Sequence, residues 1–172
     1  MKITAIPLGY LRANCYILEK NGKIIIIDPG DEYEKIYPHT KDKEIIKILI
    51  THYHPDHIGA LKYFDENLIL KNPKPKTYTF EPFSFDVIET KGHTKDSVTY
   101  YFKNEKTMFT GDFLFKENIG RTDMPTGSDE DMQKSIKLIK TYPDDIKIYP
   151  GHGEPTTLKR EKESNYFFKT LY

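Results

Sequence analysis

The stretch His52-Tyr53-His54-Pro55-Asp56-His57 holds three of the six histidines of the chain within six residues. At the His and Asp content of this chain, the pattern His-x-His-x-Asp-His is expected by chance roughly 5 × 10⁻⁴ times, so composition does not explain it. The apolar, β-branched run Ile45–Ile50 that precedes it is typical of a buried strand. Imidazole nitrogens and carboxylate oxygens bind first-row divalent metals, and a loop leaving a strand can direct alternate side chains to one point. The stretch therefore predicts a metal site.

Three more side chains of the same chemistry follow predicted strands further along the chain. His93 lies in Gly92-His93-Thr94, Asp112 in Thr110-Gly111-Asp112 and His152 in Gly151-His152-Gly153. Glycine allows sharp turns and close approach of the backbone, so these are places where a ligand side chain can be presented. The combined donors are too many for one tetrahedral zinc with an open position, which predicts two metal sites.

Outward from these motifs, short apolar runs alternate with turn residues. We expect strands at Lys2–Leu8, Asn14–Glu19, Lys23–Asp28, Ile45–Ile50, Leu68–Leu70, Phe83–Glu89, Ser97–Phe102, Thr107–Thr110 and Ile146–Tyr149, with a hairpin turn at Asn21-Gly22. We expect helices near Asp31–Tyr37, along Ile58, Leu61 and Phe64, behind the cap Ser128, and from Thr156 or Thr157 toward Leu171.

Length and composition narrow the class of protein. The 172 residues suit one domain, 1–172, and 26 basic against 26 acidic residues give no reason to expect a nucleic-acid or anionic-membrane partner. No apolar run exceeds four residues, which predicts a cytoplasmic chain with neither a membrane span nor a signal peptide. The single cysteine, Cys15, is expected to be a small buried residue.

The motif His52-x-His54-x-Asp56-His57, followed in order by His93, Asp112 and His152, resembles the metallo-β-lactamase superfamily. Within it, the chain is most similar to single-domain glyoxalase II-like hydrolases, through Asn14-Cys15-Tyr16, Asp28-Pro29-Gly30, Gly120-Arg121-Thr122-Asp123, and the ending Thr156-Thr157 through Glu161 to Asn165. The resemblance implies an α/β (α+β) fold, a four-layer αββα sandwich of two mixed β-sheets flanked by helices, with the site at one edge.

The resemblance also implies roles for the motif residues. His52, His54 and His93 would hold one metal, Asp56, His57 and His152 the other, and Asp112 would bridge them. The cofactors would be two divalent ions, zinc foremost, with iron or manganese as alternatives. A bridging hydroxide would be the nucleophile, and Asp56 would orient it and take its proton. The implied reaction is hydrolysis of a small-molecule thioester of the hydroxyacylglutathione type.

Three residues outside the ligand set have two interpretations each. Asp28 either makes a turn or hydrogen-bonds a ligand histidine and fixes its orientation. Arg121 is either a surface ion-pair residue or a substrate-binding residue that recognises a carboxylate. Asp123 belongs to the same substrate-binding loop, and if it pairs with Arg121 both residues are structural.

Two other functions stay open from the sequence. A mononuclear iron persulfide dioxygenase family also resembles this chain at Gly120–Asp123 and uses positions that match His52, His93 and Asp112. A non-enzymatic metal-binding module is the third class, which the open ligand geometry disfavours. No basic stripe supports nuclease activity.

Overall fold

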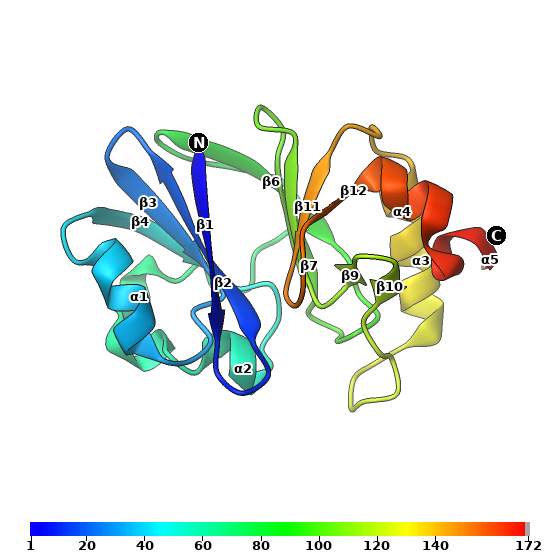
Figure 1. Ribbon diagram of the computed structural model, residues 1–172, viewed down its shortest axis with the longest axis horizontal. Coiled ribbons are helices and arrows are strands. Elements are labelled where there is room, and N and C mark those ends of the chain that lie inside the picture. Colours follow the sequence, from blue (N-terminus) through cyan, green and yellow to red (C-terminus); the bar gives the residue numbers. More distant parts are fainter. Residues whose placement is uncertain (171–172) are drawn as a thin grey trace.

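The computed structural model describes residues 1–170, in which two β-sheets pack face to face with helices on both outer sides (Figure 1). The first sheet has the order β1 (Lys2–Leu8), β2 (Ala13–Lys20), β3 (Lys23–Ile27), β4 (Glu44–Leu49). The second has the order β12 (Thr156–Thr157), β11 (Lys147–Pro150), β8 (Thr107–Gly111), β7 (Val98–Phe102), β6 (Phe83–Glu89), β5 (Thr77–Phe80). Both sheets are mixed, because β3–β4 and β8–β11 pair parallel and the other pairs are antiparallel.

The helices form the two outer layers. Helix α1 (Tyr33–Thr40) covers the first sheet, while α3 (Asp129–Lys140), α4 (Leu158–Ser164) and α5 (Tyr166–Thr170) gather on the far side of the second sheet (Figure 1). The short helix α2 (Pro55–Ile58), the 3-10 turns at Leu61–Tyr63 and Glu66–Leu68, and the two-stranded ribbon of β9 (Leu114–Phe115) and β10 (Asn118–Ile119) complete the fold. Within residues 1–170, no helix is both long and apolar enough to span a bilayer. The predicted four-layer αββα sandwich is confirmed.

The layers follow from the alternation of side chains along the strands. On β3, Ile25 and Ile27 point into the core between the sheets, where they join Phe85, Tyr100 and other aromatic residues of the second sheet. The intervening Ile24 and Ile26 face the opposite way and pack with the residues under α1. Because successive strand residues point to opposite faces, a strand of consecutive isoleucines must be covered on both sides.

Most predicted elements are confirmed within one or two residues, and a few are wrong. The expected strand Leu68–Leu70 is a 3-10 turn followed by one isolated bridge, because Asp65 caps the turn by accepting a hydrogen bond from the Asn67 amide. The expected helix after His57 is only α2 and a 3-10 turn. The predicted cap Ser128 is confirmed, as is the cap Thr157. Strands β5, β9, β10 and β12 were not predicted. The expected final helix is two helices, α4 and α5, separated at Asn165, and Leu171 lies outside the described residues.

Candidate metal centre

All seven predicted ligand residues lie at one edge of the sandwich. His52 and His54 lie in the loop after β4, and Asp56 and His57 are on α2. The other three come from the second sheet: His93 from the β6–β7 connection, Asp112 directly after β8 and His152 directly after β11. Their ligand atoms form three overlapping groups, each within 4.8 Å: His52, His54 and His93; His52, His57 and Asp112; and Asp56, His57 and His152. That these seven residues bind metal ions stays a prediction.

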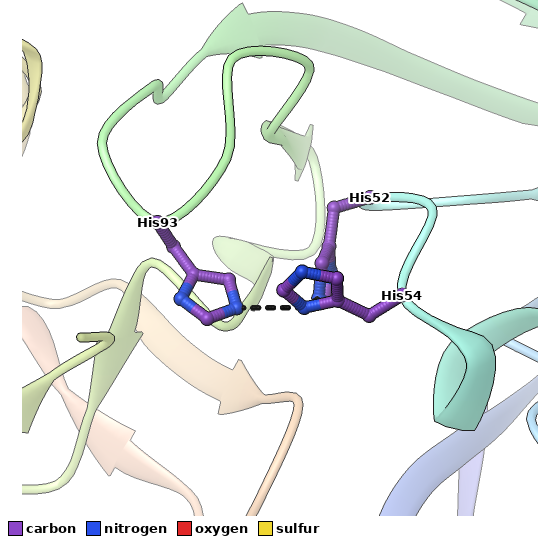
Figure 2. Close-up of side chains that lie close together, drawn as sticks. All are labelled: His52, His54 and His93. Carbon is purple, nitrogen blue, oxygen red and sulfur yellow. Dashed lines mark hydrogen bonds between the residues drawn. The ribbon is translucent and has the colours of Figure 1, made fainter. Parts of the chain in front are cut away.

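The first group consists of three imidazoles whose nitrogens converge (Figure 2). His54 Nδ1 lies 3.1 Å from His52 Nε2 and 3.0 Å from His93 Nε2, the second contact being the dashed line in Figure 2. Tetrahedral zinc with Zn–N bonds of about 2.0–2.1 Å holds its ligand nitrogens roughly 3.3 Å apart. The three nitrogens therefore have the spacing of ligands around one ion.

Hydrogen bonds on the far sides of these rings determine where the protons are. His93 Nδ1 donates to the carbonyl of Arg121 at 2.8 Å. Thr51 Oγ1 gives its hydrogen to Asp28 at 2.6 Å, so it accepts from His52 Nδ1 at 3.1 Å. In their neutral forms, His52 and His93 thus both direct a lone pair at His54 Nδ1, which has at most one hydrogen to donate. In at least one of the two contacts, two nitrogen lone pairs therefore face each other and repel. A cation between the nitrogens would remove that repulsion.

The group of Asp56, His57 and His152, called the second group from here on, has the same arrangement as the three imidazoles, with a carboxylate in place of one of them. His57 Nδ1 donates to Asp28 Oδ2 at 2.9 Å, and His152 Nδ1 donates to the carbonyl of Leu11 at 3.0 Å. Their Nε2 atoms then point inward, 3.7 and 3.3 Å from Asp56 Oδ2. Neutral imidazoles in this tautomer offer lone pairs to an anion, which a divalent cation converts into favourable bonds.

Asp112 lies between the two groups. Its Oδ2 is 3.6 Å from His93 Nε2 and 3.5 Å from His152 Nε2, and its Oδ1 is 3.4 Å from His57 Nε2. Among the described residues, His57 Nε2 and Asp112 Oδ1 are the buried side-chain atoms that lack a hydrogen-bond partner. Buried polar atoms are nearly always paired, so two such atoms facing each other fit a bridging ion position. The residues present therefore fit two divalent cations that share Asp112.

Asp28 has the second of its two predicted roles. Its buried carboxylate accepts hydrogen bonds from the Thr51 amide, the Thr51 hydroxyl and His57 Nδ1. Through Thr51 it also orients His52. One carboxylate thus sets the tautomer of a histidine in each group, which is how outer carboxylates tune metal sites.

The pKa values of the histidines shift in opposite directions in the two groups. Burial, and then the neighbouring His57, holds the pKa of His52 well below its usual range, and burial followed by His93 lowers the pKa of His54. Burial also opposes charge on His57 and His152, but carboxylates outweigh it: Asp112 and Asp28 raise the pKa of His57 to about 10, and Asp112 and Asp56 raise the pKa of His152 to about 9. The interaction with His152 lowers the pKa of Asp56, which is therefore ionised at neutral pH.

Two sequence motifs without a predicted role support the loops of the site. Asn14 donates from its side chain to the carbonyls of Pro150 and Gly153, and its backbone amide donates to Gly151, so it holds the loop of His152. Buried Glu161 accepts hydrogen bonds from the Glu117 amide and from Asn165, and thereby ties the turn between β9 and β10 to helix α4. Both motifs were visible in the sequence, but their partners are distant along the chain.

A cavity of about 700 Å³ opens over the centre. Its floor holds polar groups of the centre, and its walls are mainly apolar. The wall residues are Leu11, Pro55, Phe115, Asn118, Ile119, Gly120, Arg121 and Met124. Sequence reasoning missed Leu11, Phe115, Ile119 and Met124, because isolated apolar residues in loops carry no signal that separates a cavity wall from a core.

Arg121 and Asp123 form an ion pair with each other. Arg121 Nε and Nη2 donate to the two carboxylate oxygens of Asp123 at 2.8 and 2.9 Å. The predicted pairing is present, yet Arg121 also lines the cavity over the centre. Cys15 is buried, as predicted, and His39, which lies outside the centre, is exposed.

Comparison with known proteins agrees with this geometry. A family model of the metallo-beta-lactamase superfamily matches residues 8–88 and 74–152. The chain is 32% identical to a probable metallo-hydrolase of Streptococcus pyogenes, M6_Spy0554, over 90% of this chain and 85% of that protein. It is also 32% identical to hydroxyacylglutathione hydrolase GloC of Haemophilus influenzae, over 99% of both chains.

Solved structures resemble the whole sandwich. The B3 metallo-beta-lactamase BLEG-1 superposes with a TM-score of 0.89 at 29% identity, covering 98% of this chain and 100% of that one. TTHA1623 in a di-iron-bound form superposes with a TM-score of 0.86 at 28% identity, covering 95% and 99%. ETHE1 from Myxococcus xanthus has a TM-score of 0.83 at 25% identity, covering 96% and 84%.

Proposed function

The chain belongs to the metallo-beta-lactamase superfamily, and on that premise we propose that it is a dinuclear hydrolase of small-molecule thioesters. The observation that carries the proposal is the pair of preformed donor groups that share Asp112. A single-metal enzyme has no need of the second group, Asp56, His57 and His152, in ligand geometry.

The chemistry of the residues suits acyl hydrolysis. Two divalent cations held by these groups would lower the pKa of a water molecule and polarise a carbonyl group. Asp56 is ionised and half-buried at the cavity floor, where it would orient that water and accept its proton. The apolar wall formed by Leu11, Phe115 and Ile119 offers nonpolar contacts to the acyl group.

The proposed substrate is a thioester whose thiol carrier bears a carboxylate. Arg121 at the cavity wall offers the planar fork that recognises carboxylates. The relative from Haemophilus influenzae is named for hydrolysis of hydroxyacylglutathione, a thioester of a carrier with two carboxylates, which supports the same substrate class here.

The test is hydrolysis of a thioester panel, led by S-lactoylglutathione, by protein loaded with zinc, manganese or iron. We expect thiol release, and we expect Asp56→Asn to lower kcat/KM by about 10² or more through loss of the proton acceptor. Metal content measured on the same samples separates loss of the proton acceptor from loss of metal. The proposal is wrong if fully loaded wild-type protein releases no thiol from any member of the panel.

An iron-dependent persulfide dioxygenase is the second candidate. The observation that favours it is a cluster of two histidines and one carboxylate. Asp112 Oδ2 lies 3.9 Å from His52 Nε2 and 3.6 Å from His93 Nε2. Such a set with open positions suits non-haem iron and O₂. Protein purified without chelator or added metal decides between them: about two metals per chain supports the hydrolase, and one iron with oxygen uptake on persulfides supports the dioxygenase.

A further inference from the structure

Arg121, which forms an ion pair with Asp123, lies between two cavities. Arg121 lines the cavity over the metal centre and also a neighbouring cavity of about 490 Å³ whose walls include Asn118, Thr122 and Gln133. Asp123 lines neither. Within residues 1–170, Asp123 is the only carboxylate that pairs with Arg121, and it occupies the guanidinium fork with both oxygens.

This pair is exposed to solvent, with 66% of the Arg121 side chain and 69% of the Asp123 side chain accessible. Exposed ion pairs contribute little to stability because water screens them and ordering two side chains costs entropy. A second carboxylate that reaches the exposed guanidinium can therefore replace Asp123 at little cost.

The loop does not depend on this pair for its shape. The Arg121 carbonyl accepts the hydrogen bond from His93 Nδ1, the Thr122 hydroxyl bonds Asp129 at the start of α3, and the Gly127 amide donates to the Met124 carbonyl. The Asp123 carboxylate takes part in none of these contacts. A structural role for Asp123 would require it to hold the loop, and other groups already do so.

We propose that Asp123 is a specificity-determining residue that competes with ligand carboxylates for Arg121. The Asp123 carboxylate occupies the guanidinium of Arg121 as a ligand carboxylate would, until a carboxylate of the thiol carrier displaces it. The competition weakens the binding of anionic carriers, whereas the affinity for neutral carriers does not depend on residue 123. The substrate class in this inference rests on the proposed function, whereas the competition itself is a binding property that needs no turnover.

The test compares two thioether probes on zinc-loaded protein, S-methylglutathione and its diamide, in which both carboxylates are carboxamides. Their dissociation constants are measured by NMR titration for wild type and for Asp123→Asn. We expect the preference for the carboxylate probe over the diamide to rise about two- to five-fold in Asp123→Asn, the range expected for removing an exposed ion-pair competitor.

Two further variants separate competition from other effects. Asp145→Asn makes the same charge change in an exposed pair with Lys106, which precedes β8 at the end of the strand opposite Asp112, and should leave the preference unchanged. In an Arg121→Gln background, Asp123→Asn should lose most of its effect, because no fork remains to compete for. Carboxylate binding to the metal itself would persist in that background and is thereby recognised.

An unchanged or reduced preference in Asp123→Asn overturns the inference, since a reduced one means that Asp123 orients Arg121 for the ligand. Failure of both probes to bind wild type and Asp123→Asn overturns it as well. The proposed function fails separately, by lack of thioester hydrolysis, whatever the binding preference turns out to be.

Discussion

Four of the five histidines of the centre, namely His52, His57, His93 and His152, have one ring nitrogen held by a protein group and the other directed inward. In His57 and His152, Nδ1 donates to Asp28 and to the Leu11 carbonyl, so Nε2 faces the carboxylates of Asp56 and Asp112. Without a metal, a proton on Nε2 offsets those negative charges. Protons and metal ions therefore compete for the same atoms, which makes stability depend on pH in opposite ways for the two forms.

We predict that the metal-free protein loses stability as pH rises from 6.5 to 9, whereas stabilisation by zinc grows over the same range. In the folded, metal-free protein, the pKa of His152 is raised to about 9 and that of His57 to about 10. In the unfolded chain, each is near the ordinary value of about 6.5. A histidine whose pKa is higher in the folded than in the unfolded protein contributes its full stabilisation when the pH is below the unfolded pKa. This contribution is lost as the pH rises through the folded pKa.

Urea unfolding with chelator or with zinc at pH 6.5, 8 and 9 measures this dependence. His152→Gln should flatten the profile of the metal-free protein, while His39→Gln, which changes an exposed histidine outside the centre, should not. Metal-free protein that gains stability between pH 6.5 and 9 would contradict the prediction.

At the scale of elements, the centre depends on how closely the loops after β8 and β11 approach. A Cβ atom at Gly151 would lie 2.2 Å from Asp112 Oδ1 and 2.8 Å from His57 Cε1, closer than any side chain allows. Gly153, two residues further on, has open space around its Cβ position but a φ of +78°. One loop thus contains a glycine required by packing against the site and another required by backbone conformation.

We predict that Gly151→Ala weakens metal binding by about 10- to 100-fold, the range seen when support of metal ligands is lost, because Asp112 and His57 must move. Gly153→Ala is the matched control and should cost about 1 kcal/mol of folding stability through its positive φ, with metal affinity largely kept. Competition with a metal chelator and urea unfolding measure the two effects. Equal metal affinity in both variants would show that the close approach of the loops is not required.

The elements themselves were largely predictable, because strand and helix periods are local. Helix α3 is recognisable from its cap and from Met132 and Ile136 on one face, and the structure buries that face. The strand expected at Leu68–Leu70 fails because the cap at Asp65 bends the chain into a 3-10 turn. Short apolar runs look alike in strands and turns, so tertiary contacts decide between them.

Across the whole molecule, each group of ligands joins the two halves of the sandwich. His52 and His54 follow β4 of the first sheet and meet His93 of the second, while Asp56 and His57 meet His152. A metal ion in either group therefore cross-links the sheets in the folded state and has no preformed site in the unfolded chain.

We predict that zinc raises the midpoint of thermal unfolding by at least about 5 °C when free zinc is 100 times the dissociation constant. Binding to the folded state alone then contributes about 2.7 kcal/mol, and each kcal/mol moves the midpoint of a chain of this size by roughly 2–4 °C. Differential scanning calorimetry of chelator-treated protein with increasing zinc measures the shift. A midpoint independent of zinc concentration would contradict it.

The amino-acid sequence by itself determined most elements and the seven side chains that meet at the centre, because turn chemistry, side-chain period and ligand type are local properties. The class of fold followed from the resemblance of its motifs to the metallo-β-lactamase superfamily. The sequence also allowed a hydrogen bond from a ligand histidine to Asp28 as one of two roles for that carboxylate. Only the tertiary structure decided which nitrogen of each imidazole faces inward and which apolar residues wall the cavity. Those features depend on partners distant along the chain, which packing brings together and no local pattern encodes.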